Sequence, residues 1–230
     1  MPSVPEVPDT DEGDTDDDVL SQVLLEAREA GFLGPGPIER HLLHARGFAA
    51  LVRAQDGGAH AHLLDLGSGG GLPGLIVARD LAATTLVLLE ANERRAAFLE
   101  RAVMRCSLQD RVQVVHQRAE LYGRHPGNRM SCDGVVVRSF GPPAVVAECS
   151  APLLRVGGWL IVSEPPSEVQ PKDALLEEAG RWPADQLAQL GLQPDEFVRD
   201  EFGYQILRQV TPCPDRFPRR NGVPSKRPLF

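Results

Sequence analysis

Apolar residues follow two different periods along the chain. Positions 20, 23, 24 and 27 are apolar at helical spacing and predict a helix over 19–30 that ends at Gly31, and 38–54 predicts a second amphipathic helix. From position 61 onward, short apolar runs alternate with helical patterns. Strands are predicted at 61–67, 84–90, 111–117, 133–139 and 157–164, and the helices between them at 74–82, 92–107 and 143–155.

This alternation predicts an α/β fold. Continuous apolar strands separated by helices are typical of a parallel sheet that is covered on both faces. The end of the chain departs from the pattern, because 195–201 and 204–210 predict an antiparallel pair of strands at the sheet end. We therefore expect a mostly parallel, seven-stranded sheet with an antiparallel C-terminal pair. A length of 230 residues favours one such domain.

Charge is unevenly distributed between the two ends of the chain. Eight acidic residues and no basic residue lie within 1–18, and the remaining chain carries 24 acidic and 24 basic residues. With almost nothing to bury, 1–18 is predicted to be a disordered tail. The basic residues after Asp215, where no acid follows, are Arg216, Arg219, Arg220, Lys226 and Arg227. The predicted domain spans 19–230 and comprises a helical cap at 19–60, a sheet core at 61–210 and a basic extension at 211–230.

Several classes of protein are disfavoured by the sequence. No run of about 18 uncharged apolar residues exists, and the acidic amino end is unlike a signal or transit peptide, so we expect a cytoplasmic protein without a membrane segment. The four cysteines form no C-x-x-C pair, which argues against a disulfide framework or a structural zinc site. The spaced histidine pairs 41/44 and 60/62 lack further ligands, and we expect no metal.

A glycine-rich loop follows the first predicted strand in the stretch LLDLGSGGGLPGLIVA, residues 63–78. Where a parallel strand ends and a helix begins, bare backbone lets amide N–H groups approach a ligand. Gly69, Gly71 and Gly74 satisfy G-x-G-x-x-G, the pattern of dinucleotide sites. A tight turn without a ligand is the alternative structural interpretation.

Two carboxylates bear on the choice of ligand. Asp65 lies two residues before Gly67 and would repel a pyrophosphate, whereas it would attract the sulfonium and ammonium groups of S-adenosylmethionine. Glu90 ends the next predicted strand, where it can accept both ribose hydroxyls of either cofactor. The loop therefore favours S-adenosylmethionine over a dinucleotide.

Longer segments resemble a known family. They are LLDLGSGGGLPGLIVA, LVLLEANERRAAFLERAV, VQVVHQRAE and DGVVVRSFGPPAVVAECSAPLLRVGGWLIVSE, together with ERHLLHA before the sheet and FPRRNGVPSKRPL at the end. In order and spacing they resemble the RsmG (GidB) methyltransferases, from Glu39 to the C-terminus. That resemblance implies a Rossmann-like class I methyltransferase fold and transfer of a methyl group from S-adenosylmethionine to N7 of a guanine in 16S ribosomal RNA. The implied partner is this RNA or the small ribosomal subunit, and we expect the protein to be a monomer.

The resemblance also implies roles for individual residues. Asp65 and the glycines would line the methionine end of the cofactor, Glu90 the ribose, and Ala119 with Glu120 the adenine. Arg138, at the end of the fourth predicted strand, would be the catalytic residue beside the methyl group. The implied cofactor-binding residues are Asp65, Gly67, Ser68, Gly69, Gly71, Leu72, Glu90, Ala119, Glu120 and Arg138. The implied RNA-binding residues are Arg40, His41, Arg219, Arg220, Lys226 and Arg227.

The implied reaction requires little acid–base catalysis by the protein. Guanine N7 has an in-plane lone pair and no proton, so no general base is required and positioning dominates. The absence of an obvious catalytic dyad is consistent with this. The fourth predicted strand is followed by RSFGPP rather than an Asn/Asp-Pro-Pro-Tyr motif, which disfavours methylation of an exocyclic amine.

Three segments depart from the family pattern. The connection at 31–37 is short, RSFGPPA alters the wall beside the methyl group, and SEPPSE places Glu164 where a cation would face RNA. Three alternatives therefore stay open beside the leading hypothesis. They are a methyltransferase of another RNA or of a small molecule, a non-catalytic protein that binds the cofactor or RNA, and a dinucleotide oxidoreductase.

Overall fold

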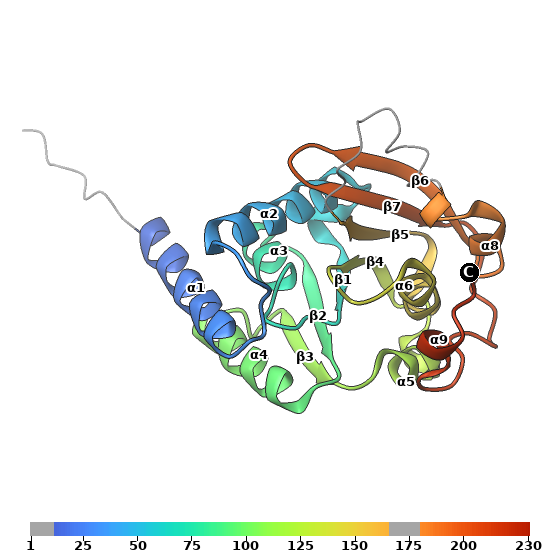
Figure 1. Cartoon of the computed structure of the whole chain (residues 1–230). Helices are drawn as coiled ribbons and strands as arrows, with labels where there is room; N and C mark the ends of the chain where they lie inside the picture. The colour runs from blue at the N-terminus through green and yellow to red at the C-terminus, as the bar shows by residue number, and fades with distance from the viewer. Residues whose placement is uncertain (1–11, 166–179) are drawn as a thin grey trace, which may run out of the picture.

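The computed structural model describes residues 12–165 and 180–230, and places one sheet between two layers of helices (Figure 1). The strands are β1 (His62–Leu66), β2 (Thr85–Glu90), β3 (Val112–His116), β4 (Cys132–Val137), β5 (Leu154–Glu164), β6 (Leu192–Arg199) and β7 (Gly203–Gln209). Their order is β3-β2-β1-β4-β5-β7-β6. The first five are parallel, and β7 runs antiparallel to both β5 and β6. The predicted mostly parallel sheet with an antiparallel C-terminal pair is confirmed.

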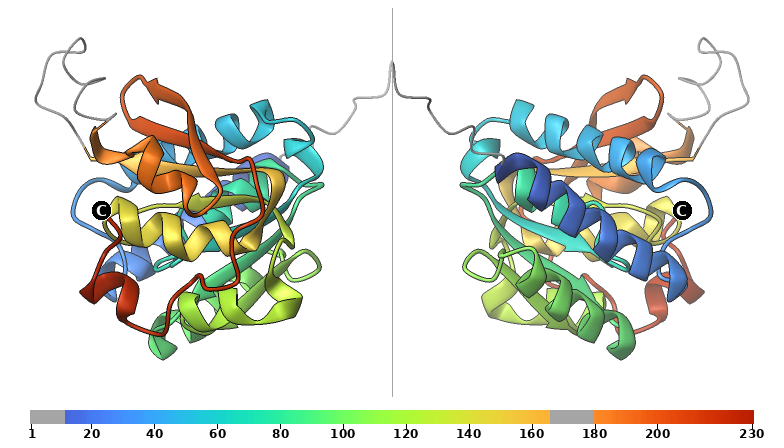
Figure 2. Two further views of the ribbon diagram at one scale, coloured as in Figure 1. Left: turned by 90° about the vertical axis from the view of Figure 1, so that its right-hand side faces the viewer. Right: turned by 90° about the vertical axis from the view of Figure 1, so that its left-hand side faces the viewer.

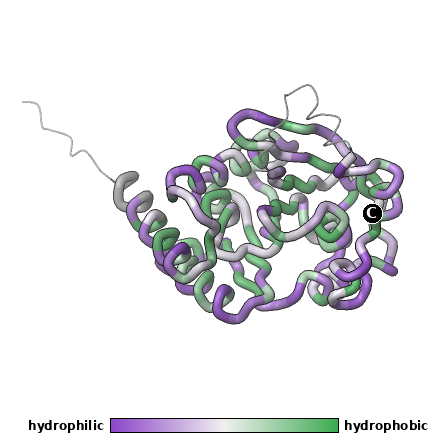
Figure 3. Tube along the Cα trace, in the orientation of Figure 1, coloured by the Kyte–Doolittle hydropathy of each residue, from purple (hydrophilic) through white to green (hydrophobic). Residues whose placement is uncertain are grey.

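Two hydrophobic cores lie on opposite faces of the sheet. Side chains alternate along a strand, so Leu63 joins one core and Leu64 the other, both fully buried. The first core is covered by α1 (Glu12–Glu29), α2 (Ile38–Ala54), α3 (Gly74–Asp80) and α4 (Glu93–Arg105). The second is covered by α5 (Ala119–Arg124), α6 (Pro143–Ser150) and α8 (Ala184–Ala188) (Figure 2). Hydrophobic residues line the central strands, whereas the tip of the β6–β7 hairpin is largely hydrophilic (Figure 3).

Some predicted boundaries are wrong. Helix α1 begins at Glu12, so the expected disordered tail at 1–18 is too long, and 1–11 lie outside the described residues. Acidic residues are favoured in the first turns of a helix, which lets the amphipathic pattern extend backward through them. Helix α6 ends at Ser150, because Pro152 cannot continue it, and a 3₁₀ turn at Ala151–Leu153 leads directly into β5. The short helices α5, α8 and α9 (Val223–Lys226) were not predicted.

The topology creates a ligand crevice at one edge of the sheet. The chain moves outward from β1 through β2 to β3, then returns to pair β4 on the other side of β1. Ligands bind outside the carboxyl ends of parallel strands at such a switch point. Gly67 follows β1 there and Arg138 follows β4, so the fold brings both predicted site residues to the same crevice. Among the described helices, none combines the length and apolar character needed to cross a membrane.

Candidate active site

The buried carboxylate of Asp65 is the main charged group beneath the glycine loop. Its side chain is 1% exposed, and Oδ2 accepts a hydrogen bond from the Gly74 amide at 2.9 Å. Among the described residues, Oδ1 has no hydrogen-bond partner. Burial raises the pKa of this carboxyl to about 7, and the nearby Glu90 carboxylate acts in the same direction. A cationic ligand that reached Oδ1 would satisfy an acceptor that the protein leaves unpaired.

The glycine loop turns sharply above this carboxylate. Gly67, Gly69 and Gly71 have φ angles of 74°, 57° and 97°, a region that side chains disfavour. The Gly67 and Ser68 amides both donate to the Leu89 carbonyl, at 2.8 and 3.2 Å. The Ser68 hydroxyl donates to the Asp65 carbonyl at 3.0 Å. These bonds fix the loop against β1 and β2, and Leu33 packs against the loop at Gly70.

Glu90 stands at the end of β2 beside the loop. Its Oε2 accepts from the Gly69 amide at 2.9 Å and its Oε1 from the Asn92 amide at 2.8 Å. Each carboxylate oxygen retains a second lone pair, so the group can still accept hydroxyl protons from a ligand. It lines a cavity of about 210 Å³ together with Gly67, Ala119 and Phe140.

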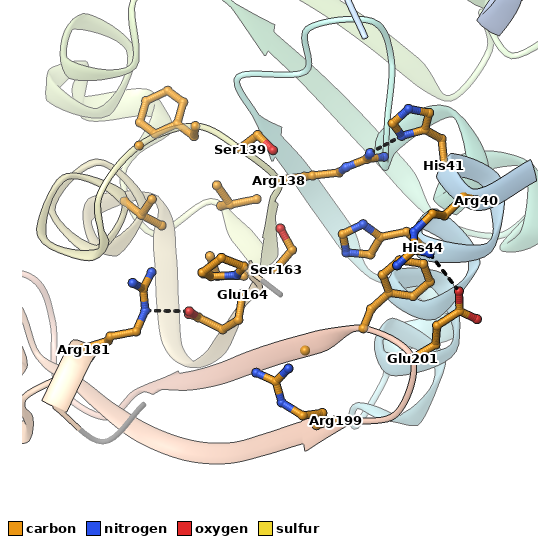
Figure 4. A pocket seen from close by; sticks show the side chains of 18 of the residues that line it. Arg40, His41, His44, Arg138, Ser139, Ser163, Glu164, Arg181, Arg199 and Glu201 are labelled. Atoms are coloured by element: carbon orange, nitrogen blue, oxygen red, sulfur yellow. Dashed lines mark hydrogen bonds and ion pairs between the residues drawn. The ribbon is translucent and has the colours of Figure 1, made fainter. Parts of the chain in front are cut away.

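A second, larger cavity of about 510 Å³ adjoins the first (Figure 4). Both cavities are lined by Ser139 and Phe140, directly after β4. A Cβ at Gly67 would collide with the Phe140 ring, so this ring packs against the glycine loop itself. Ser139 adopts a φ of 56°, a left-handed conformation that costs energy for a residue with a side chain. Strained backbone thus lies where the two cavities meet.

Arg138 extends into the larger cavity and is held by His41 (Figure 4). The guanidinium Nη2 donates to His41 Nδ1, and His41 Nε2 hydrogen-bonds the Gly34 carbonyl at 3.1 Å. Burial lowers the pKa of His41, and the positive charge of Arg138 lowers it further. A neutral ring that donates from Nε2 and accepts at Nδ1 satisfies both bonds. The Nη1 atom of Arg138 is buried and has no partner among the described residues.

The other predicted cofactor residues occupy different positions. Ala119 lines the smaller cavity, whereas Leu72 is 5% exposed and packs in the core. The Glu120 carboxylate accepts from the Gly222 amide at 2.8 Å, and Glu120 does not line the cavity. Successive helix residues point about 100° apart, so Ala119 and Glu120 face different neighbours. Glu120 thus ties the C-terminal segment to α5, a role that its expected place against the adenine did not anticipate.

The predicted RNA-binding residues divide into two groups. Arg40 lines the larger cavity, where its guanidinium lies 5.3 Å from the ring centre of Phe202. Arg219 instead donates from its backbone amide and its guanidinium to the fully buried Glu148, at 2.6–2.8 Å. This pairing raises the pKa of Arg219 and engages its charge inside the protein. The exposed basic residues of the C-terminal segment are Arg216, Arg220, Lys226 and Arg227.

Glu164 does not present a negative charge to the cavity, contrary to the expectation above. Its carboxylate is buried and accepts from Arg181 Nε at 2.7 Å and from Trp182 Nε1 at 2.6 Å (Figure 4). Arg181 lines the larger cavity with 41% of its side chain exposed, so a cation faces the cavity there. The sequence pattern gave no signal for this pair, because Arg181 lies 17 positions after Glu164 and no periodicity relates the two.

The residues of the smaller cavity fit a cationic nucleoside cofactor. Glu90 lines the cavity and offers lone pairs for hydroxyl groups, and Gly67 lines it with bare backbone. Asp65 does not line the cavity, and its unpaired acceptor is buried beneath the loop that follows it. A diphosphate in this cavity would meet the Glu90 carboxylate, with Arg95 as a cation among the lining residues and none from the glycine loop. The described residues contain no cluster of three or more metal-ligating side chains, and the four cysteines are free thiols.

Comparison with known proteins identifies one family and relatives that carry the same name. The model of the family "rRNA small subunit methyltransferase G" matches residues 36–174. Ribosomal RNA small subunit methyltransferase G of Pelotomaculum thermopropionicum is 32% identical over 194 residues, 83% of this chain and 77% of the relative. The protein of the same name from Chloroflexus aggregans is 33% identical, covering 84% of this chain and 78% of its own. An O-methyltransferase from Bacillus cereus, solved in complex with SAH, superposes with a TM-score of 0.60 at 20% identity, over 84% of this chain and 91% of that chain.

Proposed function

Because the chain belongs to the rRNA small subunit methyltransferase G family, we propose that it methylates N7 of a guanine in small-subunit ribosomal RNA. S-adenosylmethionine is the cofactor, as the sequence analysis expected. When bound, it supplies a sulfonium methyl group that a lone pair can attack. The residues of this chain hold the cofactor, orient the base and exclude water.

The observation that carries the proposal is the meeting of two cavities at Ser139 and Phe140. The smaller cavity is lined by Gly67, at the start of the glycine loop, and by Glu90, and the larger one is lined by Arg138 and has room for a nucleobase. A methyl donor and an acceptor placed on the two sides of this junction would lie close enough for in-line transfer. Positioning of this kind is sufficient for attack by N7, which has no proton to lose.

Arg138 is the residue best placed to orient the base. Arginine commonly donates to the O6 and N7 atoms of guanine. Since N7 must remain free to react, the unpaired Nη1 of Arg138 would donate to O6 alone. The bond from Nη2 to His41 fixes the guanidinium in this direction. His41, expected at the RNA surface, would therefore position Arg138 rather than contact RNA itself.

The structure removes one argument for a small-molecule substrate. That alternative was favoured partly because Glu164 would repel RNA, and the buried Glu164 is paired with Arg181. Among the described residues, four arginines line the larger cavity, Arg40, Arg138, Arg181 and Arg199, against two acids, Glu164 and Glu201. This balance favours a negatively charged substrate.

Methyl transfer can be tested with labelled S-adenosylmethionine. The acceptors are small ribosomal subunits and naked 16S rRNA from a strain that lacks guanine-N7 methylation, and products are mapped by cleavage at N7-methylguanosine. We expect label at a single guanine, and we expect Arg138→Ala to abolish labelling while S-adenosylhomocysteine still binds. Label on another base or atom would refute the guanine-N7 assignment. No label on either RNA, from a protein that binds the cofactor, would refute the proposed function.

A further inference from the structure

The larger cavity contains a fixed cation that the proposed chemistry does not use. Arg181 lies at the cavity wall opposite Arg138, and Figure 4 shows the two guanidinium groups on different sides of the opening. Its Nε donates to the Glu164 carboxylate at 2.7 Å. A guanidinium has five N–H donors, so the terminal nitrogens keep donors beyond this bond, and they are drawn turned away from Glu164 (Figure 4).

The surroundings of Arg181 hold it in one place. The next residue, Trp182, is 2% exposed and donates to the other oxygen of Glu164 at 2.6 Å. Glu164 ends β5, in the middle of the sheet, and its side chain is 1% exposed. The negative end of the pair is therefore inside the protein and the positive end is toward the cavity. A guanidinium restrained in this way loses little further freedom when it binds an anion.

We propose that Arg181, oriented by Glu164, binds a phosphate of the RNA strand next to the base that enters the cavity. The inference rests on the proposed function, since it assigns the substrate's phosphate to a site in the same cavity. Planar guanidinium groups match phosphate oxygens in pairs, which makes arginine the usual residue for this contact. Arg138 then orients the base and Arg181 fixes the backbone, so that two separate contacts define how the nucleotide enters.

A matched pair elsewhere in the chain provides a control. Arg155 Nε donates to Asp133 Oδ1 at 2.6 Å, and the Arg155 side chain is 49% exposed, close to the 2.7 Å and 41% of Arg181. The two acids differ in burial, because the Asp133 side chain is 31% exposed and that of Glu164 is 1% exposed. Arg155 lies near the start of β5, roughly 30 Å along the strand from Glu164. The control pair therefore has the same arginine–carboxylate bond and a similarly exposed arginine, at the opposite edge of the sheet.

The test compares two double variants that leave the net charge unchanged. Glu164→Gln with Arg181→Gln removes the proposed contact without leaving a buried carboxylate unpaired, and Asp133→Asn with Arg155→Gln is the control. Binding of a 16S rRNA transcript is measured against salt concentration with S-adenosylhomocysteine present. We expect the first variant to weaken binding about tenfold or more and to reduce the slope of log K against log salt by about 0.7, as for one phosphate contact to a single strand. The control should match the wild type.

The outcomes separate this inference from the proposed function. If the Glu164/Arg181 variant binds S-adenosylhomocysteine normally and keeps the wild-type slope, Arg181 does not contact phosphate. If both double variants lose the same affinity for RNA, the loss is not specific to the cavity, and this result also contradicts a phosphate contact by Arg181. Because binding is measured without turnover, a reduced slope would support the phosphate contact even if no guanine were methylated. The methyl-transfer assay tests that reaction independently.

Discussion

The buried carboxyl of Asp65 should destabilise the cofactor-free protein at neutral pH. Its pKa in the folded state is about 7, against an ordinary value of 3.8, because burial disfavours the charged form. The folded state therefore keeps a proton between about pH 4 and 7 that the unfolded chain releases. Stability contributed by this proton is lost as the pH rises through that window. Asp65→Asn removes the ionisation and keeps an acceptor for the Gly74 amide.

The expected effect follows from the pKa difference. At 1.36 kcal/mol per pH unit, the raised pKa lowers the stability of the wild type by about 1.7 kcal/mol at pH 5 and by about 4.3 kcal/mol at pH 8, relative to a carboxyl with the ordinary pKa. The free energy of unfolding of Asp65→Asn minus that of the wild type should thus grow by about 2.6 kcal/mol between these pH values. A constant cost of about 1–3 kcal/mol for burying an unpaired amide cancels in that comparison. Urea unfolding of both cofactor-free proteins measures the difference.

Cofactor affinity should change in the opposite direction. A cation bound at Oδ1 requires the ionised carboxylate, so the wild-type dissociation constant for S-adenosylmethionine should fall about 15-fold from pH 5.5 to 7. Asp65→Asn should bind about tenfold or more weakly at pH 7, because a charged hydrogen bond is lost. Calorimetric titration across this range tests both expectations. Unfolding and binding curves that stay parallel for the two proteins would refute the reasoning, because Asp65 would then carry the same charge in every state.

Two further predictions concern the RNA side of the site. His41→Ala should lower the rate of single-turnover methyl transfer at least tenfold, because Arg138 loses the side chain that holds it, and cofactor affinity should stay unchanged. A rate equal to that of the wild type would show that Arg138 does not need His41 for its position. The double variant Arg220→Gln with Lys226→Gln should reduce the slope of log K for RNA binding against log salt by about 1.4, because both side chains are exposed. Arg219→Gln should mainly lower the melting temperature, because Arg219 neutralises the buried carboxylate of Glu148. An unaltered slope for the double variant, or a stable Arg219→Gln protein, would contradict these assignments.

The strands of the sheet could be predicted from the sequence because each one is marked by a run of neighbouring apolar residues. Each parallel strand is a continuous apolar run, and the glycine loop marks the turn after β1, so strand order and crevice follow from general rules of α/β topology. Helix ends were less predictable. The first turns of α1 consist of acidic residues that look disordered by composition, although the same residues are favoured at a helix start. For 12–18, composition thus predicts disorder, whereas the preference for acidic residues at the start of a helix predicts helix.

The site residues that sequence patterns missed are those with distant partners. Glu120 and Arg219 looked like ligand-binding residues, yet they join the C-terminal segment to α5 and α6 through Gly222 and Glu148. Gly222 is 102 positions from Glu120 and Glu148 is 71 positions from Arg219, and no periodicity relates them. A charged residue in a motif can bind the ligand or can pair with another residue of the protein. Which of the two it does depends on whether a buried group of opposite charge lies within contact distance.

The same dependence on distant partners decides how the departures around β5 should be understood. A glutamate at the end of a strand facing an RNA crevice would be a strong argument against an RNA substrate if it stood alone. Here Arg181 and Trp182 come from 17 and 18 positions away, bury the carboxylate and leave a guanidinium at the cavity. The substitution therefore keeps a positive charge at the cavity while changing the residue that carries it. A departure from a family motif is thus informative about substrate only after its partners are known.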